Sequence, residues 1–231
     1  MTVVDLLWGT PERPKRGPKP ALSQAAIVEA AIAVADAEGL AALSMQRVAE
    51  RLGFTKMSLY RYLPGRAELT ALMLDAALGP APELPPAAEH GEPWRAGLRA
   101  WTHAIHDRYR AHPWSLDLTV GIRPIGPNEL AWFEVALAAL AHTPLTSAER
   151  MDAVVLVNGH VRNLTQQTRN PNEDTEAQLA QQFGAVLADR AEQFPHATAA
   201  FAAATGQDNA LEFGLDRILD GLAVLIAGRS S

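Results

Sequence analysis

Two short helical segments, each with its own capping residue and separated by one glycine, most constrain the fold of this chain. Ser44 can cap a helix that runs to Leu52, and Thr55 can cap a second helix that ends near Tyr62. Gly53 lies between them and supplies the backbone geometry of a tight turn. This pattern is typical of a helix-turn-helix. No stretch shows the sustained apolar–polar alternation of a strand, so we predict an all-α protein.

Charge is divided unevenly along the chain. The formal net charge is −6, but residues 13 to 66 hold nine Lys and Arg residues against four acids, a net charge of +5. The rest of the chain must then carry a net charge of −11. A basic region on an acidic body is attracted to a polyanion in one orientation only. We therefore expect the basic region to bind double-stranded DNA.

Composition excludes several other classes of protein. There is no cysteine, so disulfides, thiolate zinc sites and cysteine nucleophiles are absent, and a reducing cytoplasm is the expected compartment. No apolar run is long enough to suggest a signal peptide or a membrane span. The sequence contains no glycine-rich phosphate loop, nucleophile elbow or HExxH helix, so we expect neither an enzyme nor a cofactor.

Proline and glycine divide the chain into segments. We predict a flexible basic arm at residues 1–20, a three-helix DNA-binding domain at 21–66, a connecting helix to residue 78 and a Pro-rich stretch at 79–93. That stretch is either a linker between domains or a loop within one domain. Residues 94–231 form a helical ligand-binding and dimerisation domain, for a total of about nine to ten helices. Its helices are expected near 94–111, 128–141, 147–167, 175–193 and 210–227, and residues 114–120 are ambiguous.

The basic region resembles a known family. Residues 43 to 74, LSMQRVAERLGFTKMSLYRYLPGRAELTALML, resemble the DNA-binding signature of the TetR (tetracycline repressor) family, and the first helix of that domain, IVEAAIAVADAEGL, precedes them. Near the C-terminus, EFGLDRILDGLAVLI resembles the last helix of one TetR ligand-domain subtype. The resemblance implies an N-terminal helix-turn-helix that enters the major groove and a helical domain that senses a small molecule.

Thirteen residues are candidate DNA contacts. Three of them, Lys56, Met57 and Ser58, are placed by the resemblance against bases, and Tyr60 and Arg66 against phosphates. Tyr62 departs from the family pattern, which often has His and then Phe where this chain has Tyr62 and Leu63. The basic arm either reaches into a minor groove or only adds charge. The full set is Arg16, Lys19, Ser44, Gln46, Arg47, Thr55, Lys56, Met57, Ser58, Tyr60, Arg61, Tyr62 and Arg66.

Aromatic and polar residues beyond residue 94 could line an apolar cavity with a few polar anchors. The candidates for ligand binding are Trp101, His103, Trp132, Phe133, Asn158 and Arg162, each of which could instead be ordinary core or surface. Arg162 in an apolar helix indicates either a buried carboxylate partner or an anionic group on a ligand. His103 and His106 have a spacing that can hold a metal ion, but no acidic partner is evident for the pair, so no metal site is expected.

These observations predict a ligand-responsive repressor that binds palindromic operator DNA as a homodimer and is released by a small hydrophobic effector. One recognition helix discriminates poorly, so two are expected to pair across the operator. The apolar helices near 147–167 and 210–227 are the expected dimer interface. The alternative is a helix-turn-helix protein without a ligand, either architectural or constitutive. A large closed cavity within residues 94–228 would favour the sensor.

Overall fold

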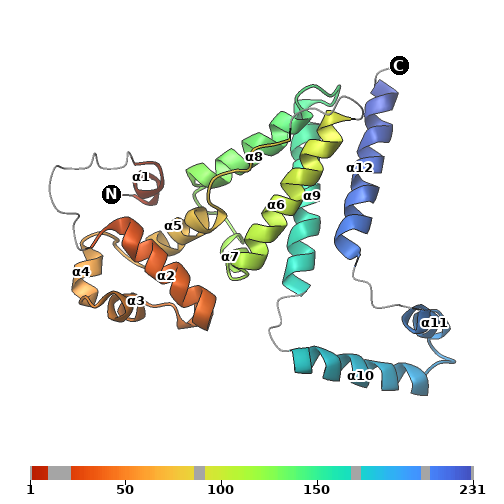
Figure 1. Cartoon of the computed structure of the whole chain (residues 1–231), viewed down its shortest axis with the longest axis horizontal. Coiled ribbons are helices and arrows are strands. Elements are labelled where there is room, and N and C mark those ends of the chain that lie inside the picture. The colour runs from red at the N-terminus through yellow and green to blue at the C-terminus, as the bar shows by residue number, and fades with distance from the viewer. Residues whose placement is uncertain (1, 10–21, 86–91, 168–172, 204–208, 230–231) are drawn as a thin grey trace.

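The structure is a computed structural model that describes residues 2–9, 22–85, 92–167, 173–203 and 209–229. Every regular element in these ranges is a helix, which confirms the predicted all-α class (Figure 1). Nine of the twelve α-helices have at least seven residues. The helices are α1 (Val3–Trp8), α2 (Gln24–Glu38), the 3-10 turn η1 (Leu40–Ala42), α3 (Met45–Leu52), α4 (Lys56–Tyr60), α5 (Arg66–Leu78), α6 (Pro93–Ala111), α7 (Ser115–Leu118), α8 (Pro127–Leu140), α9 (Ser147–Gln167), α10 (Glu173–Asp189), α11 (Pro195–Ala203) and α12 (Ala210–Arg229).

Helices α1 to α5 form a small head around one core. The Ser23 hydroxyl accepts the backbone N–H of Ala26 at 3.1 Å and so caps α2. Apolar side chains of α2, α3, α4 and α5 then meet in the interior, where the free-energy gain is about 1.5–3 kcal/mol for each large side chain that is fully buried. The side chains with no exposed surface include Ile27, Val48, Leu59, Leu63, Leu69 and Met73.

The remaining helices form a larger body. Helix α6 packs against both α8 and α9, and α12 packs against α9, so these four helices enclose a second core (Figure 1). Leu98, Leu140, Val157, Leu215 and Leu219 are completely buried in it. Helices α10 and α11 contact each other and lie apart from this bundle (Figure 1). Within the described ranges, no helix is both long and apolar enough to cross a membrane.

The N-terminal segment differs from its prediction. The sequence predicts a flexible arm for residues 1–20, whereas Val3–Trp8 is a helix. Thr2 and Asp5 form a reciprocal capping box, with the Thr2 N–H donating to Asp5 at 2.6 Å. Leu6 and Leu7 are buried in the head core, which holds this short helix in place. The basic residues Arg16 and Lys19 lie outside the described residues.

The helices of the body lie close to their predicted positions, and the ambiguous segment 114–120 contains the short helix α7. Helix α11 was not predicted. In the Pro-rich stretch, Ala81 and Leu84 pack on the core of the body, so the described part of this stretch lies along the bundle.

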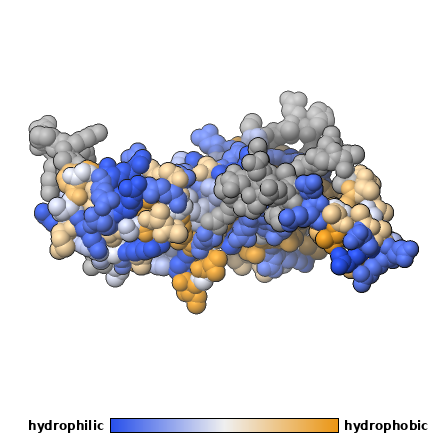
Figure 2. Space-filling view, turned by 90° about the horizontal axis from the view of Figure 1, so that it is seen from below, coloured by the Kyte–Doolittle hydropathy of each residue, from blue (hydrophilic) through white to orange (hydrophobic). Residues whose placement is uncertain are grey.

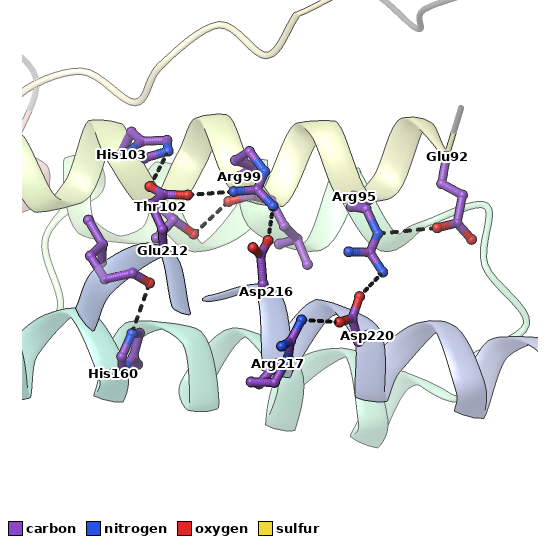
Figure 3. Close-up of polar contacts among 12 residues, drawn as sticks. Glu92, Arg95, Arg99, Thr102, His103, His160, Glu212, Asp216, Arg217 and Asp220 are labelled. Atoms are coloured by element: carbon purple, nitrogen blue, oxygen red, sulfur yellow. Dashed lines mark hydrogen bonds and ion pairs between the residues drawn. The ribbon is translucent and has the colours of Figure 1, made fainter. Parts of the chain in front are cut away.

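A ladder of ion pairs joins α6 to α12 (Figure 3). Arg95 bonds Asp220 at 2.8 Å, and Arg99 bonds Glu212 at 2.6 Å and also Asp216. The ladder ends where His103 lies 3.2 Å from Glu212. The residues on each helix recur every four positions, so one face of α6 meets one face of α12.

Candidate DNA-binding surface and ligand cavity

The helix-turn-helix is built from local hydrogen bonds. Ser44 accepts the backbone N–H of Arg47 at 3.1 Å, which caps α3. Gly53 then turns the chain with a φ of 72°, a left-handed conformation that other residues adopt at a cost. Thr55 accepts the backbone N–H of Ser58 at 3.3 Å and caps α4. The predicted pair of short capped helices is therefore present.

Helix α4 presents its side chains to solvent. Leu59 is completely buried and anchors the helix, whereas Met57 is 72% exposed. The Lys56 ammonium lies 5.7 Å from the centre of the Tyr60 ring, within the range of a cation–π contact. An exposed apolar side chain beside a cation and a phenol is suited to contact a partner with both apolar and anionic groups, as the DNA major groove has.

The other predicted contacts divide into exposed and partly buried residues. Thr55 and Arg61 are exposed, while Ser58 is half-buried against the Thr55 cap. Tyr62 is also half-buried and packs on the head core, so its ring has a structural role. Viewed from below, hydrophilic residues cover much of the head, and one hydrophobic projection stands out near the middle of the molecule (Figure 2).

Three candidate contacts bond within the head. Arg47 forms a two-pronged ion pair with Glu38, with its Nη2 at 2.7 Å, and this pairing lowers the pKa of the Glu38 carboxyl below its usual range. The Gln46 amide donates to Glu50 at 2.8 Å. The Arg66 guanidinium donates to the Leu40 carbonyl of η1 at 3.2 Å. The Nε and Nη2 groups of Arg47 are thus directed at Glu38, and contact of Arg47 with DNA stays a prediction.

A cavity of about 210 Å³ lies in the body between α6, α8 and α9, at the end of α5. Its wall is mainly aromatic and aliphatic, and one side is open to solvent, where Ile125 and Leu130 are about half exposed. The lining residues are Leu78, Trp101, Ile105, Tyr109, Thr119, Ile125, Glu129, Leu130, Trp132, Phe133, Val154, Val155 and Asn158.

Hydrogen bonds fix the aromatic wall of the cavity. The Trp101 indole N–H donates to the Trp132 carbonyl at 2.8 Å, and the Trp132 indole N–H donates to the Gly79 carbonyl at 3.0 Å. The Tyr109 hydroxyl donates to the Asn158 amide oxygen at 3.1 Å, and burial raises the pKa of Tyr109 to about 12. The phenol therefore stays neutral near pH 7, and the cavity is apolar with a polar corner at Tyr109 and Asn158.

The head and the cavity wall are joined directly. Asp75 of α5 is buried and accepts the backbone N–H groups of Asn128 and Glu129 at 2.9 and 3.2 Å, so a residue of the head caps α8. Gly126 makes this approach possible, because a Cβ atom there would lie 2.1 Å from the Asp75 carboxylate. Glu129 itself lines the cavity. A second joint forms where Trp114 donates to Asp36 of α2 at 2.6 Å.

Two family models cover most of the chain. Residues 27–73 match the model described as "Bacterial regulatory proteins, tetR family", and residues 85–226 match "Tetracyclin repressor-like, C-terminal domain". The chain belongs to the TetR family. It is therefore a DNA-binding transcriptional regulator and not an enzyme, as the sequence predicts.

Relatives of this TetR-family chain agree with that assignment. The HTH-type transcriptional repressor DrrR1 of Streptomyces coeruleorubidus is 40% identical over 237 residues, which cover 98% of this chain and 86% of DrrR1. Apo ActR from Streptomyces coelicolor is 27% identical, with a TM-score of 0.75 over 92% of this chain and 99% of ActR. ActR in complex with actinorhodin is also 27% identical, with a TM-score of 0.76 over 93% of this chain and 100% of that chain.

Four of the six predicted ligand-binding residues of this TetR-family protein meet at the cavity: Trp101, Trp132, Phe133 and Asn158. His103 does not, because it follows Trp101 by two residues, about 200° around α6, and faces Glu212 instead. The sequence argument that no acid lies near His103 is thus wrong in space. Among the described residues, however, no group of three or more His, Asp or Glu could hold a metal ion.

Arg162 also lies outside the cavity lining. It follows Asn158 by one helical turn, and its Nε atom is buried without a hydrogen-bond partner in the described part of the chain. The sequence missed other residues that do line the cavity, most clearly Ile105 and Tyr109. They follow Trp101 by four and eight residues, so the helical period of α6 could have identified them.

Proposed function

We propose that this protein is a ligand-responsive repressor that binds a palindromic operator as a homodimer and leaves it when a small, mainly apolar molecule enters the cavity. The observation that carries the proposal is the Asp75 joint, because it connects the basic head to a helix of the cavity wall. A regulator with this arrangement can convert occupancy of the cavity into movement of the head. It would act in the cytoplasm, where its DNA is.

The cavity chemistry supports an aromatic effector with a few polar groups. Trp101, Trp132 and Phe133 offer ring faces and edges, and Tyr109 with Asn158 offers hydrogen bonds at one corner. Sites for drug-sized molecules usually measure about 300–1,000 Å³. The present cavity is smaller, at about 210 Å³, so a larger effector would project through its open side. The ActR structure that contains actinorhodin makes a polycyclic aromatic molecule the first probe to test.

Exposed apolar side chains on α9 and α12 support a dimer. The ion-pair ladder occupies the face of α12 that meets α6 (Figure 3), and other residues of α12 and α9 carry apolar side chains that are exposed. A four-helix interface made from these two helices of each subunit would bury that surface. The exposed apolar residues are Met151, Val155, Leu156, Phe213, Val224 and Leu225.

Release from DNA would follow from a shift between two arrangements of the dimer. In one, the two heads match the separation of operator half-sites. In the other, the heads do not match that separation. An effector that binds this second arrangement more tightly favours it. Helix α8 then shifts, and the bonds of Asp75 to α8 transmit the shift to α5 and the head. The effector needs only a difference in affinity between the two arrangements, not a new contact with the head.

DNA binding is tested by gel shift on the DNA upstream of the protein's own gene. We expect Lys56→Ala and Tyr60→Phe to weaken binding and to leave the dimer intact in sedimentation. Because Lys56→Ala removes a cation, it should also reduce the salt dependence of the affinity by about one unit of slope, whereas Tyr60→Phe, which removes no charge, should leave the slope unchanged. Arg190→Ala is the matched control, since it removes an exposed cation far from the head. Unchanged affinity in both head variants would show that α4 is not the recognition helix.

Effector binding is tested by thermal shift with actinorhodin and smaller aromatic compounds. A stabilising compound should then release the wild-type protein from its upstream DNA. Trp132→Ala, which opens the cavity wall, should abolish both responses if the cavity is the site. If the protein binds its upstream DNA and none of the compounds releases it, the protein is instead a regulator without a ligand.

A further inference from the structure

The N-terminal helix α1 lies outside residues 27–73, which match the DNA-binding family model. It packs on α5, and its Leu6 and Leu7 side chains are buried in the head core. The Gln24 amide of α2 donates to the Leu6 carbonyl at 3.4 Å. Helix α1 is thus an added part of the head, attached to the first and last helices of its core.

The end of α1 reaches the body. The Trp8 indole N–H donates to the Ile125 carbonyl at 2.9 Å, across 117 residues of sequence. Ile125 lines the open side of the cavity and is 52% exposed, and Trp8 is 48% exposed. One short helix therefore extends from the buried core of the head to the rim of the ligand cavity.

Helices α1 and α5 hold the same short stretch of the body. Trp8 bonds residue 125, and Asp75 bonds residues 128 and 129. The Arg123 guanidinium donates to the Glu129 carboxylate at 2.7 Å, which closes this stretch on itself. A molecule that projects through the open side of the cavity would meet Ile125, and the head is bonded to this same residue.

We propose that α1 is a strap that ties the cavity rim to the head and sets the orientation of the head for DNA. The strap acts beside the covalent connection through α5. The proposal relies on the proposed function only for its DNA readout.

The orientation of the head can be measured without a ligand or DNA. The chain has no cysteine, so Ala41→Cys in the head and His142→Cys in the body give two specific spin-label sites on exposed residues. Labelled protein is diluted with unlabelled protein so that the distance is measured within one chain. We expect Trp8→Phe, which keeps the ring but loses the N–H, to broaden the distance distribution. Trp8→Ala should broaden it further.

Val4→Ala is the matched control, because Val4 is an exposed residue of the same helix. Its distance distribution should equal that of the unmodified double-cysteine protein. Equal distributions for Trp8→Phe, Trp8→Ala and Val4→Ala would overturn the strap. Because Trp8→Phe changes neither Leu6 nor Leu7, its result remains decisive even if Trp8→Ala fails to fold.

DNA binding provides the second readout. Loss of one hydrogen bond across the domain boundary should lower the affinity of Trp8→Phe for the upstream DNA by about three- to tenfold, with Val4→Ala within about twofold of wild type. A broadened distribution with unchanged DNA affinity would overturn the role of α1 in orienting the head. If wild-type protein itself does not bind that DNA, the proposed function fails, and the spin-label distances still decide whether α1 is a strap.

Discussion

The Asp75 carboxylate accepts the backbone N–H of Asn128 at 2.9 Å, so a residue of the head caps the first turn of a helix in the body. The Asn128 side chain returns a bond to the Asp75 carbonyl at 3.0 Å. Each helix thus satisfies polar groups of the other, in a region that water reaches poorly. These two hydrogen bonds couple the position of α5 to that of α8.

Removal of the Asp75 carboxylate should destabilise the protein. In Asp75→Ala the two N–H groups at the start of α8 lose their acceptor, at an expected cost of about 1–3 kcal/mol in the free energy of unfolding. Asp75→Asn keeps an oxygen acceptor and should lose less. Urea denaturation followed by circular dichroism measures both. If Asp75→Ala is as stable as wild type, this contact contributes nothing to the stability of the junction.

The same residue should give the protein a pH-dependent stability. Burial raises the pKa of Asp75 above its ordinary value of 3.8. The folded protein therefore holds this proton more tightly than the unfolded chain does, and the resulting stabilisation is complete below the ordinary pKa and lost as pH rises through the raised one. The free energy of unfolding of wild type minus that of Asp75→Asn should grow as pH falls toward the ordinary value of 3.8. A difference that does not vary with pH would contradict this.

Glu38→Gln should strengthen binding to DNA. Glu38 holds the Arg47 guanidinium by three hydrogen bonds, and the neutral amide would release it toward phosphate. We expect a several-fold gain in affinity for the upstream DNA by fluorescence anisotropy at moderate salt. Glu29→Gln on the same helix makes the same change in net charge without contacting Arg47. Equal gains in the two variants would mean that only the overall charge matters.

Trp132→Phe should destabilise the cavity wall. The smaller ring cannot donate to the Gly79 carbonyl, which then loses its buried partner at a cost of about 1–3 kcal/mol. Trp94→Phe is the comparison, because Trp94 is a buried indole of the same core whose nitrogen makes no hydrogen bond among the described residues. Thermal unfolding should show the larger loss for Trp132→Phe. Equal losses would indicate that ring size, not the hydrogen bond, is what matters.

The ion-pair ladder should contribute little to stability. Arg99 and its partners Glu212 and Asp216 are each about one third or more exposed, so solvent screens their attraction. Arg99→Ala should cost no more than about 1 kcal/mol at low salt, and less at high salt. Arg110→Ala, at an exposed position of the same helix, should be neutral. A large loss that salt does not reduce would show that the ladder is effectively buried.

The parts of the fold that the sequence predicts well are those encoded within a few residues. The caps Ser44 and Thr55 and the turn at Gly53 act within three or four positions of the chain, so their pattern is visible without any tertiary structure. Helix α1 has only six residues, too few to show a period, and it depends on the burial of Leu6 and Leu7 in a core formed by later segments.

The contacts between head and body could not be predicted from the sequence, because they join residues that are far apart in the chain. Asp75 is one of four polar residues in the sequence of α5, and its partner Asn128 lies 53 positions later. The cavity lining was partly predictable, since Trp101 and Asn158 are found there. His103 lies outside this cavity, as the helical period alone indicates, because residues two positions apart lie on nearly opposite sides of a helix.

The close approach of Gly126 to Asp75 should make substitutions at these two positions depend on each other. A side chain at position 126 would clash with the carboxylate of Asp75. A larger residue is therefore expected at 126 only where the residue at 75 is no longer an acid. Among related repressors, those that keep an acid at the position of Asp75 should keep glycine at that of Gly126, and those that lose the acid should be free to vary there. This pair of positions would then distinguish the members of the family whose heads are clamped to their cavities from those whose heads are not.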